Sequence, residues 1–171
     1  IKELLRPMVK EIEIRSEKRT VKIGGEYVMF RHEMTYLNPP PIAIDVADNM
    51  SKEELAKRID IAENFKYEYI GRELTLDLLA PRSVTNDPEE YKKLVRFVVS
   101  NSSLPLVLCS LNPKVLEAGL GEVHDGKPLL YAATKDNWRE VAELALKHKV
   151  PVVVSSPGNL DMLVTLANTL A

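Results

Sequence analysis

Short apolar runs alternate with amphipathic stretches along this chain from residue 42 onward. Each run has the length of a buried strand, and a polar segment and then apolar residues at helical spacing follow it. Such alternation is typical of parallel strands covered by helices. The runs that predict strands are Ile42–Ala47, Thr75–Ala80, Leu104–Ser110, Pro128–Ala133 and Val150–Ser155.

Capping residues mark where the helices begin. Ser51 and Glu54 have the spacing of a capping box, and Asp87 precedes a proline and two glutamates. The other helix starts have as cap candidates Asn112, Asp136 and Asn159. The helix after Asp87 has an apolar stripe that should face a sheet, formed by Tyr91, Leu94, Val95 and Val98. The sequence therefore predicts about five β/α units.

The first part of the chain has a different pattern. Two β-prone runs in Thr20–Arg31 flank Gly24 and Gly25, and paired glycines supply the positive φ angles of a two-residue hairpin turn. We therefore expect a β-hairpin there. Residues 1–19 are charged and amphipathic, and they are predicted to form a linker or a helical lead-in.

The predicted fold class is α/β, as part of a TIM-type barrel. Right-handed crossovers between parallel strands can close a barrel or leave an open sheet, and periodicity alone does not decide between them. Strand order without a switch favours the barrel. Five strands would leave two unpaired edges, so we expect residues 20–171 to be the first part of a longer barrel.

Composition narrows the functional classes. The 171 residues are 45% hydrophobic and 28% charged, with a net charge of -2 and no long basic stretch, so nucleic acid is not an expected partner. No apolar run approaches the roughly 20 residues that span a bilayer, and no membrane association is expected. The single cysteine, Cys109, excludes a disulfide framework within the chain and predicts a cytoplasmic protein.

In either architecture, ligands bind at the loops that follow the strands. The candidate cofactor-binding residues in these loops are Asp45, Asp48, Asn112, Thr134, Asp136 and Asn137. Helix capping is the simpler role for Asn112 and Asp136. Asp45 lies inside an apolar run, where a buried carboxylate needs a partner; Arg82 and Lys135 are candidates for an ion pair, and a ligand role is the alternative. No catalytic residue and no set of metal ligands is predicted.

One segment also resembles a known family. GGEYVMFRHE (residues 24–33) lies in a stretch, 20–46, that resembles the entry to the barrel domain of the corrinoid iron-sulfur protein large subunit, called gamma in the archaeal acetyl-CoA decarbonylase/synthase. LPLVLCSLNPKVLEAGL (104–120) and KPLLYAATKDNW (127–138) are similar to that family in order and spacing. The resemblance covers nearly all of the chain after Arg19.

The resemblance implies a role in methyl transfer. In that family a four-iron (4Fe-4S) cluster domain lies upstream of the barrel and a corrinoid (cobalt) domain lies downstream. A methyltransferase moves a methyl group from a methylated pterin onto the cobalt, which delivers it to acetyl-CoA synthase, and a small (delta) barrel subunit is the partner. Because neither cofactor domain falls in this chain, the expected role of the chain is that of a non-catalytic scaffold.

Two alternatives remain open at this point. A pterin-binding methyltransferase barrel would use Asp45, Asp48, Asn112 and Asp136 to hydrogen-bond a pterin at the strand ends. A complete, open, doubly wound α/β domain with five strands would be a binding module.

Overall fold

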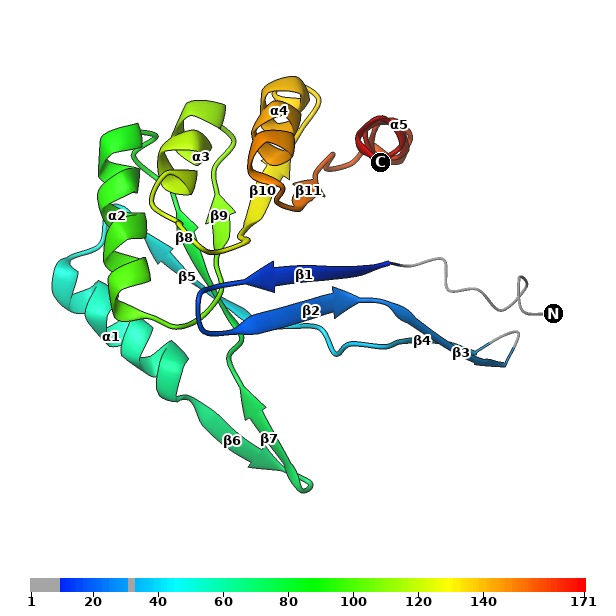
Figure 1. The fold of residues 1–171 in the computed structure, drawn as a ribbon, viewed down its shortest axis with the longest axis horizontal. Coiled ribbons are helices and arrows are strands. Elements are labelled where there is room, and N and C mark those ends of the chain that lie inside the picture. The colour runs from blue at the N-terminus through cyan, green and yellow to red at the C-terminus, as the bar shows by residue number, and fades with distance from the viewer. Residues whose placement is uncertain (1–9, 31–32) are drawn as a thin grey trace.

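A computed structural model describes residues 10–30 and 33–171. Its centre is a sheet of five parallel strands (Figure 1). The order of these five strands across the sheet is the order in which they occur along the chain. The strands are β5 (Ala43–Ala47), β8 (Leu78–Arg82), β9 (Val107–Cys109), β10 (Leu129–Ala133) and β11 (Val152–Val154). This arrangement confirms the α/β class and the sequential order of strands.

A helix follows each of these strands. The helices are α1 (Lys52–Asn64), α2 (Pro88–Asn101), α3 (Pro113–Leu120), α4 (Trp138–His148) and α5 (Leu160–Leu170). Ser51 and Glu54 form the predicted capping box of α1, and the side chains of Asp87, Asn112 and Asn159 cap α2, α3 and α5. At α4 the prediction was wrong by one residue, because Asn137 rather than Asp136 occupies the N-cap position.

Alternate residues of the strands point to opposite faces of the sheet. Val46, Leu79, Leu108 and Leu130 face the helices and form one buried cluster with apolar residues of α1 to α4, to which Leu170 of α5 adds. The helices therefore cover one face of the sheet. This arrangement differs from a doubly wound sheet, which has helices on both faces.

β1 (Glu11–Arg15) covers the other face near the amino ends of the strands. Ile14 is fully buried there against Leu78, Ala80 and Val107. Two hydrogen bonds between Arg15 and Lys127, of 2.7 and 2.9 Å, hold β1 at the start of β10. The described part of residues 1–19 thus contains a strand where a linker or helical lead-in was predicted.

The predicted hairpin over residues 20–31 was also wrong in its pairing. β2 (Thr20–Gly24) pairs antiparallel with β1, and β3 (Glu26–Phe30) pairs with β4 (Glu33–Tyr36). Gly24 and Gly25 do have positive φ angles, of 73° and 70°, but they join two hairpins instead of turning one. An added Cβ at Gly25 would lie 2.8 Å from the Cγ of Glu11. Burial of Ile14 stabilises the β1–β2 pairing, which local turn chemistry could not indicate.

A further hairpin separates α1 from β8. β6 (Lys66–Tyr69) and β7 (Arg72–Thr75) pair antiparallel around Ile70 and Gly71, whose φ angles of 49° and 71° suit a two-residue hairpin turn. The strand predicted over 75–80 begins only at Leu78. The Asp77 carboxylate accepts a 2.9 Å hydrogen bond from the backbone N–H of Ile42. This bond lies just before β5 and β8 begin.

One buried hydroxyl joins the middle of the sheet to the helices. Tyr91 of α2 is fully buried, and its Oη donates to the carbonyl of Pro81 at 2.8 Å and accepts from the N–H of Cys109 at 3.1 Å. It therefore links β8 to β9. Burial raises the pKa of Tyr91 well above its usual value, so the hydroxyl keeps its proton. An added Cβ at Gly119 of α3 would lie 2.6 Å from the Tyr91 ring, so this position needs glycine.

The substitution Tyr91→Phe should lower the free energy of unfolding by about 1 to 3 kcal/mol, because it leaves a buried N–H and a buried carbonyl unpaired. Urea unfolding, followed by the fluorescence of Trp138, measures the change. Tyr67→Phe, at a half-exposed ring, is the control and should change stability by less than about 0.5 kcal/mol. Equal stabilities of the two variants would contradict this role for Tyr91.

Candidate functional site

The predicted site residues follow the carboxyl ends of the parallel strands. Asp45 alternates with two residues that face the helices, so its side chain lies on the opposite face, where it is 47% exposed. Its carboxylate pairs with Arg82 Nη2 at 2.9 Å and with Arg58 Nη1 of α1 at 3.2 Å. The predicted pairing with Arg82 is confirmed, and Lys135 is not a partner. The expected burial was wrong, because β5 is an edge strand whose free face is open.

Asp48 organises the loop that follows β8. Its two carboxylate oxygens accept hydrogen bonds from the Ser83 hydroxyl at 3.1 Å, the Val84 N–H at 2.8 Å and the Thr85 hydroxyl at 2.7 Å. Burial raises the pKa of this carboxyl, but the hydrogen bonds outweigh it and hold the pKa below its usual value. The ionised Asp48 carboxylate therefore connects the loop after β5 to the loop after β8.

Asn112 has the capping role that was the simpler expectation. Its Oδ1 accepts from the N–H of Lys114 at 3.1 Å, which satisfies a free donor in the first turn of α3. Its Nδ2 donates to Asn86 Oδ1 at 3.0 Å. The side-chain amide thus joins the loop after β9 to the loop before α2.

Asn137 is buried, with 7% of its surface exposed. Its Oδ1 accepts from the Thr134 hydroxyl at 3.0 Å, and its Nδ2 donates to the carbonyls of Leu111 and Ala132 at 2.7 and 3.1 Å. These bonds fasten the loop after β10 to the loop after β9. Asp136 is exposed, and within residues 10–30 and 33–171 its carboxylate has no hydrogen-bond or ion-pair partner.

Two residues on the free face were not candidates. Tyr131 of β10 is 44% exposed, and Cys109 of β9 packs near Leu78 and Val107. Burial raises the pKa of the Cys109 thiol to about 11, so it is not a thiolate near neutral pH. Tyr131 lies inside the strand and not in a loop after it, so the rule that selects strand-end loops did not include it; the available signal was a tyrosine hydroxyl within an otherwise apolar run.

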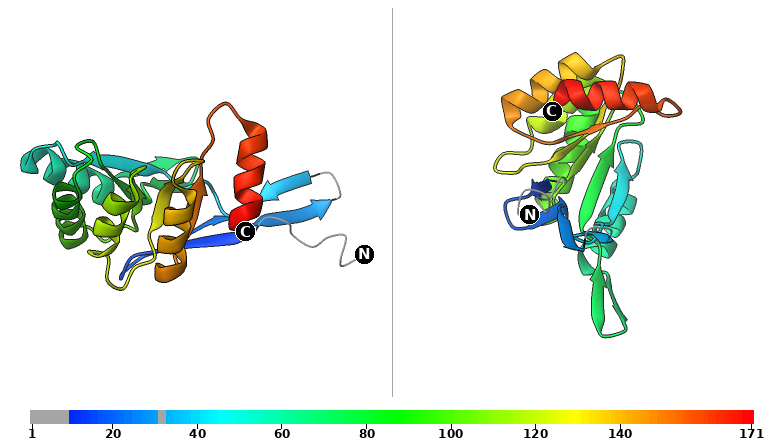
Figure 2. Two further views of the ribbon diagram at one scale, coloured as in Figure 1. Left: turned by 90° about the horizontal axis from the view of Figure 1, so that it is seen from above. Right: turned by 90° about the vertical axis from the view of Figure 1, so that its right-hand side faces the viewer.

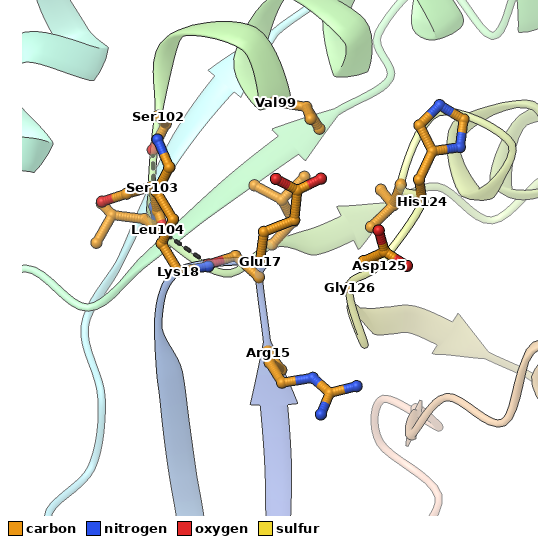
Figure 3. Close-up of a pocket in the computed structure, with 13 residues that line it drawn as sticks. Arg15, Glu17, Lys18, Val99, Ser102, Ser103, Leu104, His124, Asp125 and Gly126 are labelled. Carbon is orange, nitrogen blue, oxygen red and sulfur yellow. Dashed lines mark hydrogen bonds between the residues drawn. The ribbon is translucent and has the colours of Figure 1, made fainter.

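A small cavity lies at the opposite, amino end of the sheet (Figure 3). Figure 3 shows Glu17 and Lys18 of the β1–β2 loop, Ser103 after α2 and His124 after α3 around it. Its volume is about 70 Å³, whereas sites for drug-sized ligands span roughly 300 to 1,000 Å³. It is therefore too small for a pterin or a corrinoid.

A wider groove of about 830 Å³ separates α4 from α5. Trp138, Ala142, Val152 and Leu170 contribute to its largely apolar wall. Lys149 is the ionisable side chain in this wall. The groove offers packing area but no group that suits proton transfer or metal binding.

The donor atoms of the chain do not fit an iron-sulfur cluster, which takes four cysteine thiolates. The chain has one cysteine. In the described ranges, no three His, Cys, Asp or Glu side chains come together in a metal-binding arrangement. None of the helices in the described part of the chain combines the length and apolar character that a membrane crossing requires.

The fold and the site define a parallel α/β scaffold whose strand-end polar groups bond to one another. The family described as CO dehydrogenase/acetyl-CoA synthase delta subunit matches residues 11–171. The chain belongs to that family.

Similar proteins carry the name acetyl-CoA decarbonylase/synthase complex subunit gamma. The one from Methanosarcina acetivorans is 48% identical over 168 residues, which cover 98% of this chain and 36% of that protein. The one from Archaeoglobus fulgidus is 42% identical over 167 residues, 98% of this chain and 35% of that protein. The predicted link to the acetyl-CoA decarbonylase/synthase system is confirmed, and the chain spans about a third of the length of these curated relatives.

The substitution Asp48→Asn should destabilise the fold by about 1 to 2 kcal/mol at pH 7, because it weakens hydrogen bonds to a charged acceptor. Since the folded pKa is depressed, this contribution is present above the unfolded value of about 3.9 and is lost as the pH falls through the folded pKa. Urea unfolding at pH 7 and at pH 3 tests this difference. Asp136→Asn is the control; a destabilisation independent of pH would contradict the role of the charge.

Proposed function

We propose that this chain is the first part of a barrel domain that acts as a scaffold in the gamma-type, large subunit of a corrinoid iron-sulfur methyl carrier. The observation that carries the proposal is the 48% identity to a subunit gamma across 98% of the chain. The description of the matching family names the delta subunit, whereas the names of the relatives favour gamma.

The geometry of the sheet supports a barrel. Its five strands run parallel in sequence order, and the helices cover one face, which is how strands and helices are arranged in a (β/α)₈ barrel. β5 and β11 are the edge strands of this sheet. Further strands would pair with these edges and enclose the face that carries Asp45, Arg82 and Tyr131.

A scaffold role agrees with the bonding of the strand-end residues. Asp48, Asn112 and Asn137 use their side chains to join loops of this chain to one another. A pterin site would need such carboxylate and amide groups free to face the ligand. Asp136 and part of Asp45 are exposed, and neither lines the small cavity or the groove described above.

The cofactor chemistry then belongs to other parts of the full-length protein. There a corrinoid would accept a methyl group from a methylated pterin, through a methyltransferase, and pass it to acetyl-CoA synthase, while a four-iron cluster would serve reductive reactivation. The barrel would position these domains and bind the small (delta) subunit. With a single cysteine, this chain fits a cytoplasmic protein.

The test uses the full-length protein, purified without oxygen and with corrinoid supplied. Cobalt and iron are measured per polypeptide together with the visible spectrum. We expect about one cobalt and about four irons, the iron content of one cubane cluster. Absence of both metals would contradict the methyl-carrier proposal. Saturable binding of methyltetrahydrofolate to a protein without cobalt would favour the pterin-binding alternative instead.

A further inference from the structure

The β6–β7 hairpin stands apart from the rest of the fold. It forms a two-stranded sheet of its own, and Figures 1 and 2 show it extending away from the central sheet below α1. All eight of its strand residues are exposed. An isolated two-stranded hairpin is marginally stable in water. Its length and shape are therefore not explained by packing within the described chain.

The two faces of this hairpin differ sharply in chemistry. Tyr67 lies opposite Leu74, and Tyr69 lies opposite Arg72, so these four side chains share one face. The other face is formed by Lys66, Glu68, Glu73 and Thr75. There the Lys66 ammonium bonds both oxygens of Glu73, at 3.1 and 3.2 Å. The hairpin is amphipathic, with one charged face that is partly neutralised internally.

The apolar face is open to solvent. Tyr67 is 55% exposed, Tyr69 57%, Leu74 45% and Ile70, at the tip, 83%. Phe65 precedes β6 and lies two residues before Tyr67, in the same alternation as the two tyrosines, and it is 43% exposed. Clustered exposed apolar side chains mark interaction surfaces, and tyrosine and arginine are enriched among residues that dominate binding. The composition of this face is that of a protein interface.

Charge identifies the kind of partner. In the described ranges Arg72 forms no ion pair, and the apolar face that it shares carries no carboxylate. A second copy packed face to face would present the same face, which has no carboxylate to pair with Arg72. The face instead fits an apolar surface that offers a carboxylate to Arg72.

We propose that this hairpin face, formed by Tyr67, Tyr69, Ile70, Arg72 and Leu74, docks a different polypeptide of the same assembly through an apolar surface with a carboxylate. The inference rests on the proposed function, which makes the chain part of a multi-subunit complex. It adds the surface and the chemistry of contact.

The first experiment compares full-length variants for binding to the purified remaining subunits. Arg72→Glu reverses the charge on the apolar face and should weaken binding at least about tenfold. Glu68→Lys is the matched control, because it reverses a charge on the opposite face of the same hairpin, and it should change the affinity by less than about twofold. Equal affinity of Arg72→Glu and the unaltered protein would overturn the inference.

The second experiment places the photocrosslinking residue p-benzoylphenylalanine at position 69, in place of Tyr69, and maps the crosslink in the assembled complex by mass spectrometry. A crosslink to another subunit, in an apolar segment that contains an acid, supports the inference. A crosslink to a second copy or to a later segment of the same polypeptide overturns it, as does the absence of a crosslink.

Cobalt content distinguishes failure of the docking inference from failure of the proposed function. If the unaltered protein binds cobalt and assembles while Arg72→Glu assembles equally well, the docking inference alone fails. If the unaltered protein neither binds cobalt nor assembles, the proposed function fails and the docking inference fails with it.

Discussion

The arrangement of this fold depends on the two hydrogen bonds of the Tyr91 hydroxyl. The N–H of Cys109 reaches the carbonyl of Pro81 only through this hydroxyl, so α2 is part of the junction between β8 and β9. The next backbone bond between the strands, from Ser83 N–H to the Cys109 carbonyl, is 3.0 Å long. Gly119 allows α3 to approach the same ring. A single side chain thus sets the spacing of two strands and two helices, and a buried hydroxyl in that position must bond both groups or destabilise them.

The two ends of the sheet differ because β1 covers only one of them. Ile14 covers the face opposite the helices near the amino ends of the strands. It does not cover the same face near their carboxyl ends. Asp45, Arg82 and Tyr131 stay half-exposed on that open part. In the loops just beyond, Asp48 and Asn137 hold neighbouring loops together. Hydrogen bonds within the chain therefore connect the loops at the carboxyl edge.

Such an edge agrees with the proposed scaffold role. Exposed apolar side chains lie on the hairpin that follows α1 and along the groove between α4 and α5, and Asp48 and Asn137 are engaged in hydrogen bonds between loops. The family is described as CO dehydrogenase/acetyl-CoA synthase delta subunit, and the similar proteins are named as subunits of an acetyl-CoA decarbonylase/synthase complex.

The sequence by itself determined the five helices, four of their caps and the five parallel strands, because capping and apolar periodicity are local signals. It also indicated two possible partners for Asp45, Arg82 and Lys135, between which the structure decides in favour of Arg82. Tertiary structure alone decided that β2 pairs with β1 rather than β3, that Arg58 joins Asp45, and that Asn137 is buried. The first and the third depend on burial against residues distant in sequence, and the second depends on how α1 packs beside β5. The free energy gained by burying Ile14 outweighs the local preference of Gly24 and Gly25 for a two-residue turn. The spacing of the two glycines alone does not indicate which of these effects is larger.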